Sequence, residues 1–166
     1  MSATDTSAMR PLLFPDDTQF WYETLRALGH TAYGGADIGE VVTTAARISA
    51  DDYGSWYEQS AATAERVEAE ARGQLAAGHQ VSGRDGLLRA ATYWRSAEFF
   101  TRDGDPGPRG RAAYQASVGC SADAAALMSP AVTPVTIPFE GKALPGYLYQ
   151  PPTMTIPSLA YPNVAN

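Results

Sequence analysis

Apolar residues recur at intervals of three and four as far as about Met128, which predicts a series of amphipathic helices. The first predicted helix follows Asp16 and Asp17, whose side chains can cap its exposed N–H groups, and it stops near Gly29. The second follows Asp37 in the same way. The apolar positions that define these two helices are Phe20, Trp21, Leu25, Leu28, Ile38, Val41, Val42, Ala45 and Ile48.

Two further helices are predicted in the middle of the chain. A long helix follows Asp52 and runs from about Tyr53 to Ala77, with its charged residues largely outside one apolar stripe. The sequence Ser82-Gly-Arg-Asp85 resembles a capping box and predicts the start of the next helix. Apolar residues occur almost all round that helix, so we expect it to be central. The short Gly-His-Gln-Val link between the two helices predicts an antiparallel hairpin.

A last helix and a β-hairpin complete the pattern. Prolines and glycines make residues 103–110 a loop, and a helix then runs from about Arg111 to Met128, where Ser129-Pro130 ends it. Two predicted strands follow, Val132 to Phe139 and Leu144 to Tyr149, around a turn at Glu140-Gly-Lys142. The predicted fold class is therefore mainly α, a helical bundle followed by a short β-hairpin.

We divide the chain into four segments on this basis. Residues 1–10 form a flexible tail, and residues 11–130 form the helical domain. Residues 131–150 hold the hairpin, and residues 151–166 form a Pro-rich tail whose lack of periodicity suits disorder. Two strands alone are marginal in water and an unpaired edge invites association, so we expect dimerisation or aggregation through residues 132–149.

Composition excludes several classes of function. The net charge is −6 and the sequence has no basic run, which disfavours nucleic-acid binding. A single cysteine and two histidines cannot supply a zinc site or an internal disulfide, and we expect Cys120 to be a small buried residue. Gly34-Gly35 lacks the lysine and glycine spacing of a phosphate loop. Taken together, these observations lead us to expect neither a metal nor a cofactor. No stretch is long and apolar enough for a membrane span, and we expect a cytoplasmic protein.

Three stretches, read together, resemble one family. They are Leu13–Arg26 with Tyr33–Asp37 (LFPDDTQFWYETLR and YGGAD), Ser82–Phe100 (SGRDGLLRAATYWRSAEFF) and Val135–Tyr149 (VTIPFEGKALPGYLY). Their order and spacing resemble the opening part of alpha/beta-hydrolases related to 2,6-dihydroxypseudooxynicotine hydrolase, which also look like fermentation-respiration switch esterases and fungal polyketide-shortening hydrolases. The resemblance covers roughly residues 11–150.

The resemblance implies a specific role for each part of the chain. The helical domain would be a lid or cap that lines the substrate cavity and the dimer contact, and the hairpin would be the start of the hydrolase sheet. An apolar strand and an oxyanion-hole loop should follow, and residues 153–166 carry neither. We therefore expect the N-terminal part of an α/β-hydrolase without its catalytic core.

The catalytic groups of such a hydrolase are also missing from the sequence. The nearest approach to a Gly-x-Ser-x-Gly elbow is Gly119-Cys-Ser121-Ala-Asp123, which lacks the second glycine and lies in a predicted helix. No histidine follows His79, so a Ser121 nucleophile would have no base in the expected order. His30 and His79 sit at helix ends, where capping or exposure explains them better. We assign no catalytic residue.

Aromatic residues are the sequence feature closest to a ligand site. We name as substrate-binding candidates Phe20, Trp21, Tyr22, Tyr93, Trp94 and Glu98. The aromatic members also suit plain core packing, which we favour. For Glu98 we favour an ion pair with Arg95 or Arg102, and for Asp16-Asp17 and Asp51-Asp52 we favour helix capping over acid–base chemistry.

Three hypotheses about function follow. The first is a truncated hydrolase comprising the helical lid domain, without hydrolytic activity of its own. The second is a stand-alone helical module that binds an apolar or aromatic small molecule or a protein partner. The third is a small enzyme without a triad, in which Glu98 and tyrosines would move protons. As partners we expect a second copy of the chain or a hydrolase core.

Overall fold

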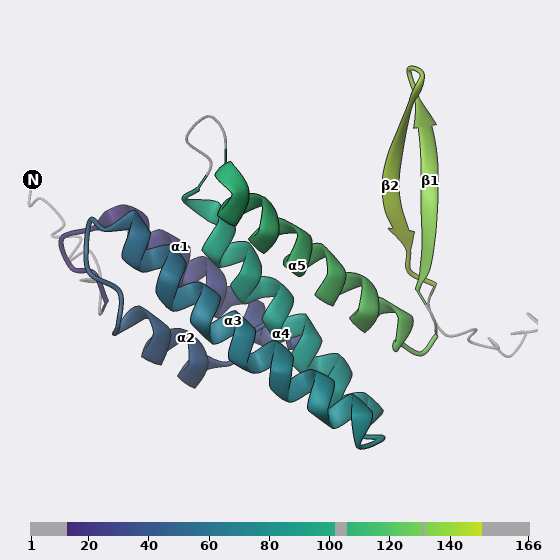
Figure 1. The fold of residues 1–166 in the computed structure, drawn as a ribbon, viewed down its shortest axis with the longest axis horizontal. Helices are drawn as coiled ribbons and strands as arrows, with labels where there is room; N and C mark the ends of the chain where they lie inside the picture. Colours follow the sequence, from purple (N-terminus) through teal and green to yellow (C-terminus); the bar gives the residue numbers. More distant parts are fainter. Residues whose placement is uncertain (1–12, 102–105, 131, 151–166) are drawn as a thin grey trace, which may run out of the picture. The chain divides into compact units, whose positions relative to one another are not determined.

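The computed structural model describes residues 13–101, 106–130 and 132–150. These residues form five α-helices, one short 3₁₀ helix and a two-stranded antiparallel sheet (Figure 1). The chain separates into two compact units, divided after Leu127. The first unit is helical and the second holds the hairpin, which confirms the predicted fold class. The predicted tails at 1–10 and 151–166 lie outside the described residues.

Aspartate caps set the starts of three helices. Helix α1 spans Thr18–Gly29, and the Asp17 carboxylate accepts a hydrogen bond from the Phe20 N–H at 2.9 Å. Asp37 caps α2 (Ile38–Ala45) and Asp52 caps α3 (Tyr53–Ala76) in the same way. These contacts confirm the capping reading of the aspartates, because each carboxylate satisfies an N–H that has no partner within its helix.

Helix α1 ends at Gly29, as predicted, but the chain does not turn there. The chain continues beyond Gly29 as the 3₁₀ helix η1 (His30–Tyr33) and turns at Gly34, whose φ of 72° suits glycine. Gly35 then passes close to α4, because a Cβ there would lie 3.3 Å from the His30 Cβ and 3.4 Å from the Thr92 Oγ1. The turn between α1 and α2 therefore begins at Gly34.

Helix α4 (Gln80–Phe99) lies between α3 and α5 (Gly107–Ala126), as predicted for a central helix (Figure 1). The predicted capping box is wrong: α4 begins at Gln80, so Ser82 lies inside its first turn. Two glycines explain the early start. A Cβ at Gly83 would lie 2.2 Å from the Leu75 Cδ2, and one at Gly86 would lie 2.6 Å from the Ala71 Cβ. Glycine therefore lets α3 and α4 approach closely, and this packing outweighs its low helix propensity.

Helix α5 also begins earlier than predicted. Pro108 was read as part of a loop, but it lies in the first turn of α5, where its missing N–H breaks no helical hydrogen bond. Gly110 lies inside the helix at a position where a Cβ would be only 2.3 Å from the Thr101 Oγ1, so the close contact there requires glycine. None of the helices in the described part of the chain has the length and apolar character needed to cross a membrane.

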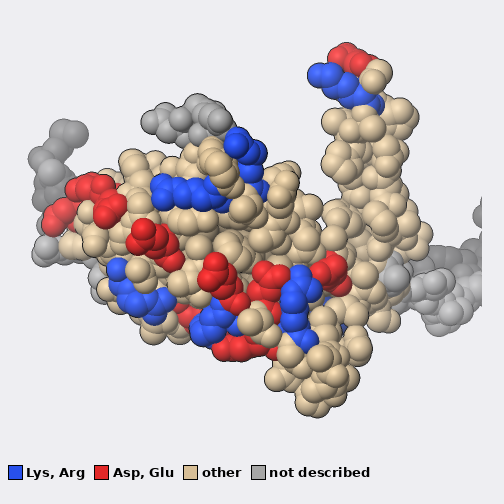
Figure 2. Space-filling model, in the orientation of Figure 1, with Lys and Arg blue, Asp and Glu red and all other residues tan. Residues whose placement is uncertain are grey.

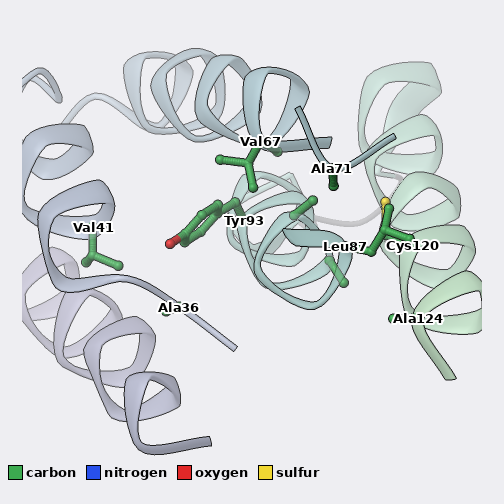
Figure 3. Packing of buried hydrophobic residues seen from close by; sticks show 11 residues of the cluster. Ala36, Val41, Val67, Ala71, Leu87, Tyr93, Cys120 and Ala124 are labelled. Carbon is green, nitrogen blue, oxygen red and sulfur yellow. The ribbon is translucent and has the colours of Figure 1, made fainter. Parts of the chain in front are cut away.

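The main core of the helical unit lies around α4. Val67 and Ala71 of α3, Leu87 of α4 and Cys120 of α5 meet at the centre of the cluster (Figure 3). Cys120 is 1% exposed, which confirms the prediction of a small buried residue. Burial, reinforced by the nearby Glu68, raises the pKa of the Cys120 thiol to about 12.

The hairpin pairs β1 (Thr133–Phe139) with β2 (Lys142–Leu148). The turn is shorter than predicted: Glu140 and Gly141, with φ of 47° and 74°, connect a closing pair formed by Phe139 and Lys142. Positive φ at both central residues is typical of a type I′ turn, which matches the twist of the two strands.

The two faces of the hairpin differ in character. Val135, Ile137 and Phe139 of β1 lie opposite Gly146, Leu144 and Lys142 of β2 and form a mostly apolar face. The other face carries Pro134, Thr136, Pro138, Ala143, Pro145 and Tyr147. Counted from the closing pair, all three prolines fall at positions that form no hydrogen bond between the strands, so their missing N–H groups cost the ladder nothing.

Candidate functional site

A groove crosses the helical unit between α1, η1 and α5, with α4 as its floor. Its volume is about 370 Å³, which lies in the range of small-molecule sites. Helix α1 contributes Arg26 and η1 contributes His30 and Tyr33. The other lining residues are Ala27, Gly35, Leu88, Ala91, Thr92, Arg95, Ser96, Ser117 and Ser121. Apolar, hydroxyl and cationic groups therefore face one open space.

Two arginines at this groove are held by buried carboxylates. Arg26 forms an ion pair with Glu23 at 2.5 Å, and Arg95 donates a hydrogen bond to Glu98. Glu23 and Glu98 are only 6% and 5% exposed. The guanidinium carbons of Arg26 and Arg95 also lie 4.6 and 5.8 Å from the centre of the Phe99 ring. These contacts fix both guanidinium groups beside one aromatic ring.

Hydroxyl groups from two helices line the same groove. Ser117 and Ser121 are one helical turn apart on α5, and Thr92 and Ser96 are one turn apart on α4. The Ser117 hydroxyl donates to the Ala91 carbonyl at 2.8 Å, which holds α5 against α4. Ser121 lies inside α5, which confirms the helical reading of the Gly119–Asp123 stretch. Its setting is not the strand-to-helix elbow that a hydrolase serine requires.

A second cavity lies among α1, α2, α3 and α4, but it is too small for a substrate. Its volume is about 30 Å³, enough for water-sized molecules only. Thr44 and Thr63 line it and share a hydrogen bond of 2.7 Å between their hydroxyl oxygens. Within the described residues, every buried side-chain nitrogen and oxygen has a hydrogen-bond partner. This cavity is part of the packing of the four helices.

Two of the predicted site residues lie in an aromatic cluster away from the groove. Phe20 is fully buried, and its ring centre lies 4.7 Å from that of Trp56 and 5.2 Å from that of Phe100. Trp21 is partly buried against the same cluster. Tyr22, the next residue of α1, is 65% exposed. None of these three side chains lines the groove.

Tyr93 lies between α2 and α4. Its hydroxyl donates to Glu40 at 2.7 Å and accepts from the Asp37 N–H at 2.9 Å, and Figure 3 shows its ring pointing toward α2. Burial, reinforced by the hydrogen bond to Glu40, raises the pKa of the Tyr93 phenol. Arg89 also donates to Glu40, at 3.1 Å. Tyr93 thus ties α4 to the start of α2 and borders the small cavity.

Trp94, the next residue of α4, contacts α3. Its indole N–H donates to Glu68 of α3 at 2.8 Å, and Arg72 donates to the same carboxylate. Burial raises the pKa of Glu68, but the hydrogen bonds from Trp94 and Arg72 outweigh burial and leave that pKa below its usual value. Trp94 therefore contributes to the packing of α3 on α4.

Glu98 is the one predicted residue that acts on the groove, and it does so through Arg95. Their contact confirms the ion pair expected for Arg95, whereas Arg102 lies outside the described residues. The prediction missed Arg26, His30 and Tyr33 because it searched for aromatic clusters. The Glu23–Arg26 spacing of three residues on a predicted helix was a usable signal.

The two histidines occupy helix ends, as expected. His30 follows the last residue of α1, and His79 precedes α4 with its ring Nδ1 2.7 Å from the Gln74 Oε1. Within the described residues, no group of three or more His, Cys, Asp or Glu side chains could hold a metal ion. The lining of the groove suits a molecule held by hydrogen bonds, ionic contacts and apolar packing.

Comparison with known proteins relates the chain to hydrolases. No protein-family model matches the sequence. The chain is 38% identical over 133 residues to the 20-hydroxy-prefusarin hydrolase of Gibberella moniliformis, a match that covers 80% of this chain and 32% of that protein. It is 35% identical over 151 residues to the alpha/beta hydrolase psoB of Aspergillus fumigatus, covering 89% and 34% of the two chains. It is also 35% identical over 140 residues to the alpha/beta hydrolase xenA of Xenoacremonium sinensis, covering 84% and 32%.

The chain spans about a third of the length of the curated relatives it matches. Over most of its length, the chain is therefore related to proteins named alpha/beta hydrolases.

Proposed function

We propose that the helical unit is the lid of an alpha/beta-hydrolase-like protein and that its groove holds part of an ester or related substrate. The observation that carries this proposal is a groove of about 370 Å³ in a chain related to hydrolases. An apolar or aromatic molecule fits its mixed lining, since Leu88 and Ala91 offer apolar contact and Arg95 offers hydrogen-bond donors. The hydrolytic step would belong to a hydrolase core.

We further propose that the 166-residue chain does not hydrolyse esters by itself. Ser121 lies inside α5, and the sequence has no histidine after His79 to act as its base. The third hypothesis relied on Glu98 as a proton carrier. Glu98 is buried and hydrogen-bonded to Arg95, an arrangement that suits a positioning role better than proton transfer.

The hairpin supports a partner for this lid. Its apolar face includes Ile137, Phe139, Leu144 and Leu148, which are 44–57% exposed. An isolated two-stranded sheet with such a face is marginal in water. We propose that a hydrolase sheet, or a second copy of this chain, covers it. The cytoplasmic location expected from the sequence is part of the proposal, and cell fractionation checks it.

Binding of 2-naphthyl acetate, an aromatic ester, tests the proposal. Amide shifts in a ¹H–¹⁵N NMR titration should change at groove residues such as Thr92 and Ser117. Ser121→Phe places a bulky ring at the groove and should abolish these changes. Gln115→Phe makes a similar substitution at an exposed site of the same helix, outside the groove lining, and should leave them intact. Shift changes confined to other parts of the chain, or absent, would refute the proposed site.

The same titration separates the lid from a stand-alone binding module. A lid completed by a hydrolase core should bind the ester weakly alone, because the core would supply the rest of the cavity. A stand-alone module should bury most of the ligand and bind it tightly. The groove is open, and this observation favours the lid.

A further inference from the structure

The charge of the groove lining is opposite to that of the chain as a whole. The chain has 12 basic and 18 acidic residues. The groove is nevertheless lined by two arginines and a histidine, and by no aspartate or glutamate among the described residues. Figure 2 shows acidic side chains spread widely over the visible face of the helical unit. The groove therefore presents cationic side chains on an acidic protein, although each arginine is paired with a carboxylate behind it.

The carboxylates that hold the arginines lie behind them and do not line the groove. Glu23 and Glu98 have side chains that are 7% and 6% exposed, whereas those of Arg26 and Arg95 are 40% and 34% exposed. In each ion pair the carboxylate is thus buried, whereas the arginine side chain is partly exposed and lines the groove. A guanidinium has five N–H donors in a planar fork, so Arg26 can keep its contact with Glu23 and present other N–H groups to a second acceptor at the groove.

Neutral donors surround the two arginines. Ser96, Ser121 and Tyr33 line the same groove, and Tyr33 has 87% of its surface exposed. Thr92 lines the groove as well, but its hydroxyl donates to the Leu88 carbonyl at 3.3 Å. Hydroxyls beside guanidinium groups are typical of sites that recognise carboxylate oxygens. Leu88 and Ala91 provide an apolar floor next to these donors, which suits the hydrocarbon part of the same ligand.

We propose that the groove recognises small molecules that join an apolar or aromatic body to a carboxylate, with the carboxylate at Arg26 and Arg95. The inference rests on the proposed function and narrows its ligand class. Hydrolysis of an ester releases a carboxylic acid, so the groove would hold either an acidic substrate or the acid product. Glu23 and Glu98 are positioning residues, because they orient the guanidinium groups and do not touch the ligand.

Comparison of two ligands tests this inference. 2-Naphthoate and 2-naphthamide have the same ring and nearly the same shape but differ in charge. With the full chain at low salt, naphthoate should bind about tenfold more tightly, since charge-assisted hydrogen bonds are stronger than neutral ones. The advantage should shrink as salt is added, because both arginines are partly exposed. Equal affinities at low salt would overturn the inference.

A double variant tests the role of Arg26 without leaving a buried charge unpaired. Glu23→Gln with Arg26→Met removes both charges of the pair, leaves the net charge unchanged and should abolish most of the preference for naphthoate. Glu70→Gln with Arg66→Met does the same to an ion pair on α3 outside the groove and should leave the preference intact. A preference retained in the first variant, or lost equally in both, would contradict the assignment.

The outcomes separate this inference from the proposed function. If 2-naphthyl acetate binds in the groove and naphthoate gains nothing over naphthamide, the carboxylate inference is wrong and the lid proposal stands. If neither 2-naphthyl acetate nor 2-naphthoate changes the amide chemical shifts of the groove residues, both proposals are wrong. Circular dichroism of each variant, with a helical signal equal to that of the unmodified chain, excludes unfolding as the cause of a lost preference.

Discussion

Replacement of Phe20 by alanine distinguishes core packing from ligand binding at the aromatic residues. Phe20 is 0% exposed, and its ring contacts those of Phe14, Tyr53, Trp56 and Phe100. Truncation of a buried phenylalanine costs about 3–5 kcal/mol through lost transfer free energy and the cavity left behind. For a chain of this size, such a loss lowers the midpoint of thermal unfolding by about 6–20 °C.

The neighbouring Tyr22 provides the matched control. It lies on the same helix but is 65% exposed, so Tyr22→Ala should change the free energy of unfolding by no more than about 0.5 kcal/mol. Urea unfolding followed by circular dichroism at a helical wavelength measures both variants. A loss below about 1 kcal/mol for Phe20→Ala, or equal losses for the two variants, would refute the packing argument.

Three further predictions concern helix packing, capping and the buried thiol. Gly86→Ala should destabilise the chain by about 1 kcal/mol, because overpacking against Ala71 costs more than the gain in helix propensity. Gly73→Ala, which has open space around it, should stabilise the chain by about 0.5–1 kcal/mol. Thermal unfolding of both variants measures the difference. Asp52→Ala should cost about 1 kcal/mol by removing the cap of α3, as urea unfolding would show, and an unchanged midpoint would argue against that cap. Cys120 should resist thiol reagents at pH 8 until the chain unfolds. Burial raises the pKa of this thiol from its ordinary value of about 9 to about 12 in the folded chain. The contribution of the neutral thiol to stability should therefore be complete below pH 9 and be lost as the pH rises toward 12, which unfolding at several pH values measures against Cys120→Ala.

The segment from Ile38 to Ile48 shows what apolar periodicity predicted about burial and helix length. The spacing from Ile38 to Ile48 suggested one continuous helix face, and α2 ends at Ala45. Ile48 is nevertheless buried, at 9% exposure, in the cluster that contains Phe20. The periodicity thus identified only part of the buried face, because Val41 and Ala45 are also buried whereas Ile38 and Val42 are 62% and 37% exposed.

Close helix contact explains the two helix starts that the sequence misplaced. Gly83 and Gly110 have low helix propensity and suggested a cap region and a loop. Each of them lies where a Cβ would meet an atom of a neighbouring segment at less than 3 Å. The need for close approach is a property of the folded chain, so local propensity could not predict it.

The groove shows the same limit for functional residues. The prediction chose Phe20, Tyr93 and Trp94 because aromatic side chains are common in ligand sites. In the structure these rings stabilise helix contacts, and the groove is lined by residues from α1, η1, α4 and α5 that are far apart in the sequence. Only Glu98 connects the two sets, through its contact with Arg95.

Release of 2-naphthol from 2-naphthyl acetate tests the central claim most directly, because it separates binding from hydrolysis in one sample. The account predicts groove shifts on addition of the ester while naphthol appears at the rate seen in buffer alone. Saturable release of naphthol that is abolished by Ser121→Ala or Glu98→Gln, with the helical signal unchanged, would contradict it and make the chain an esterase in its own right.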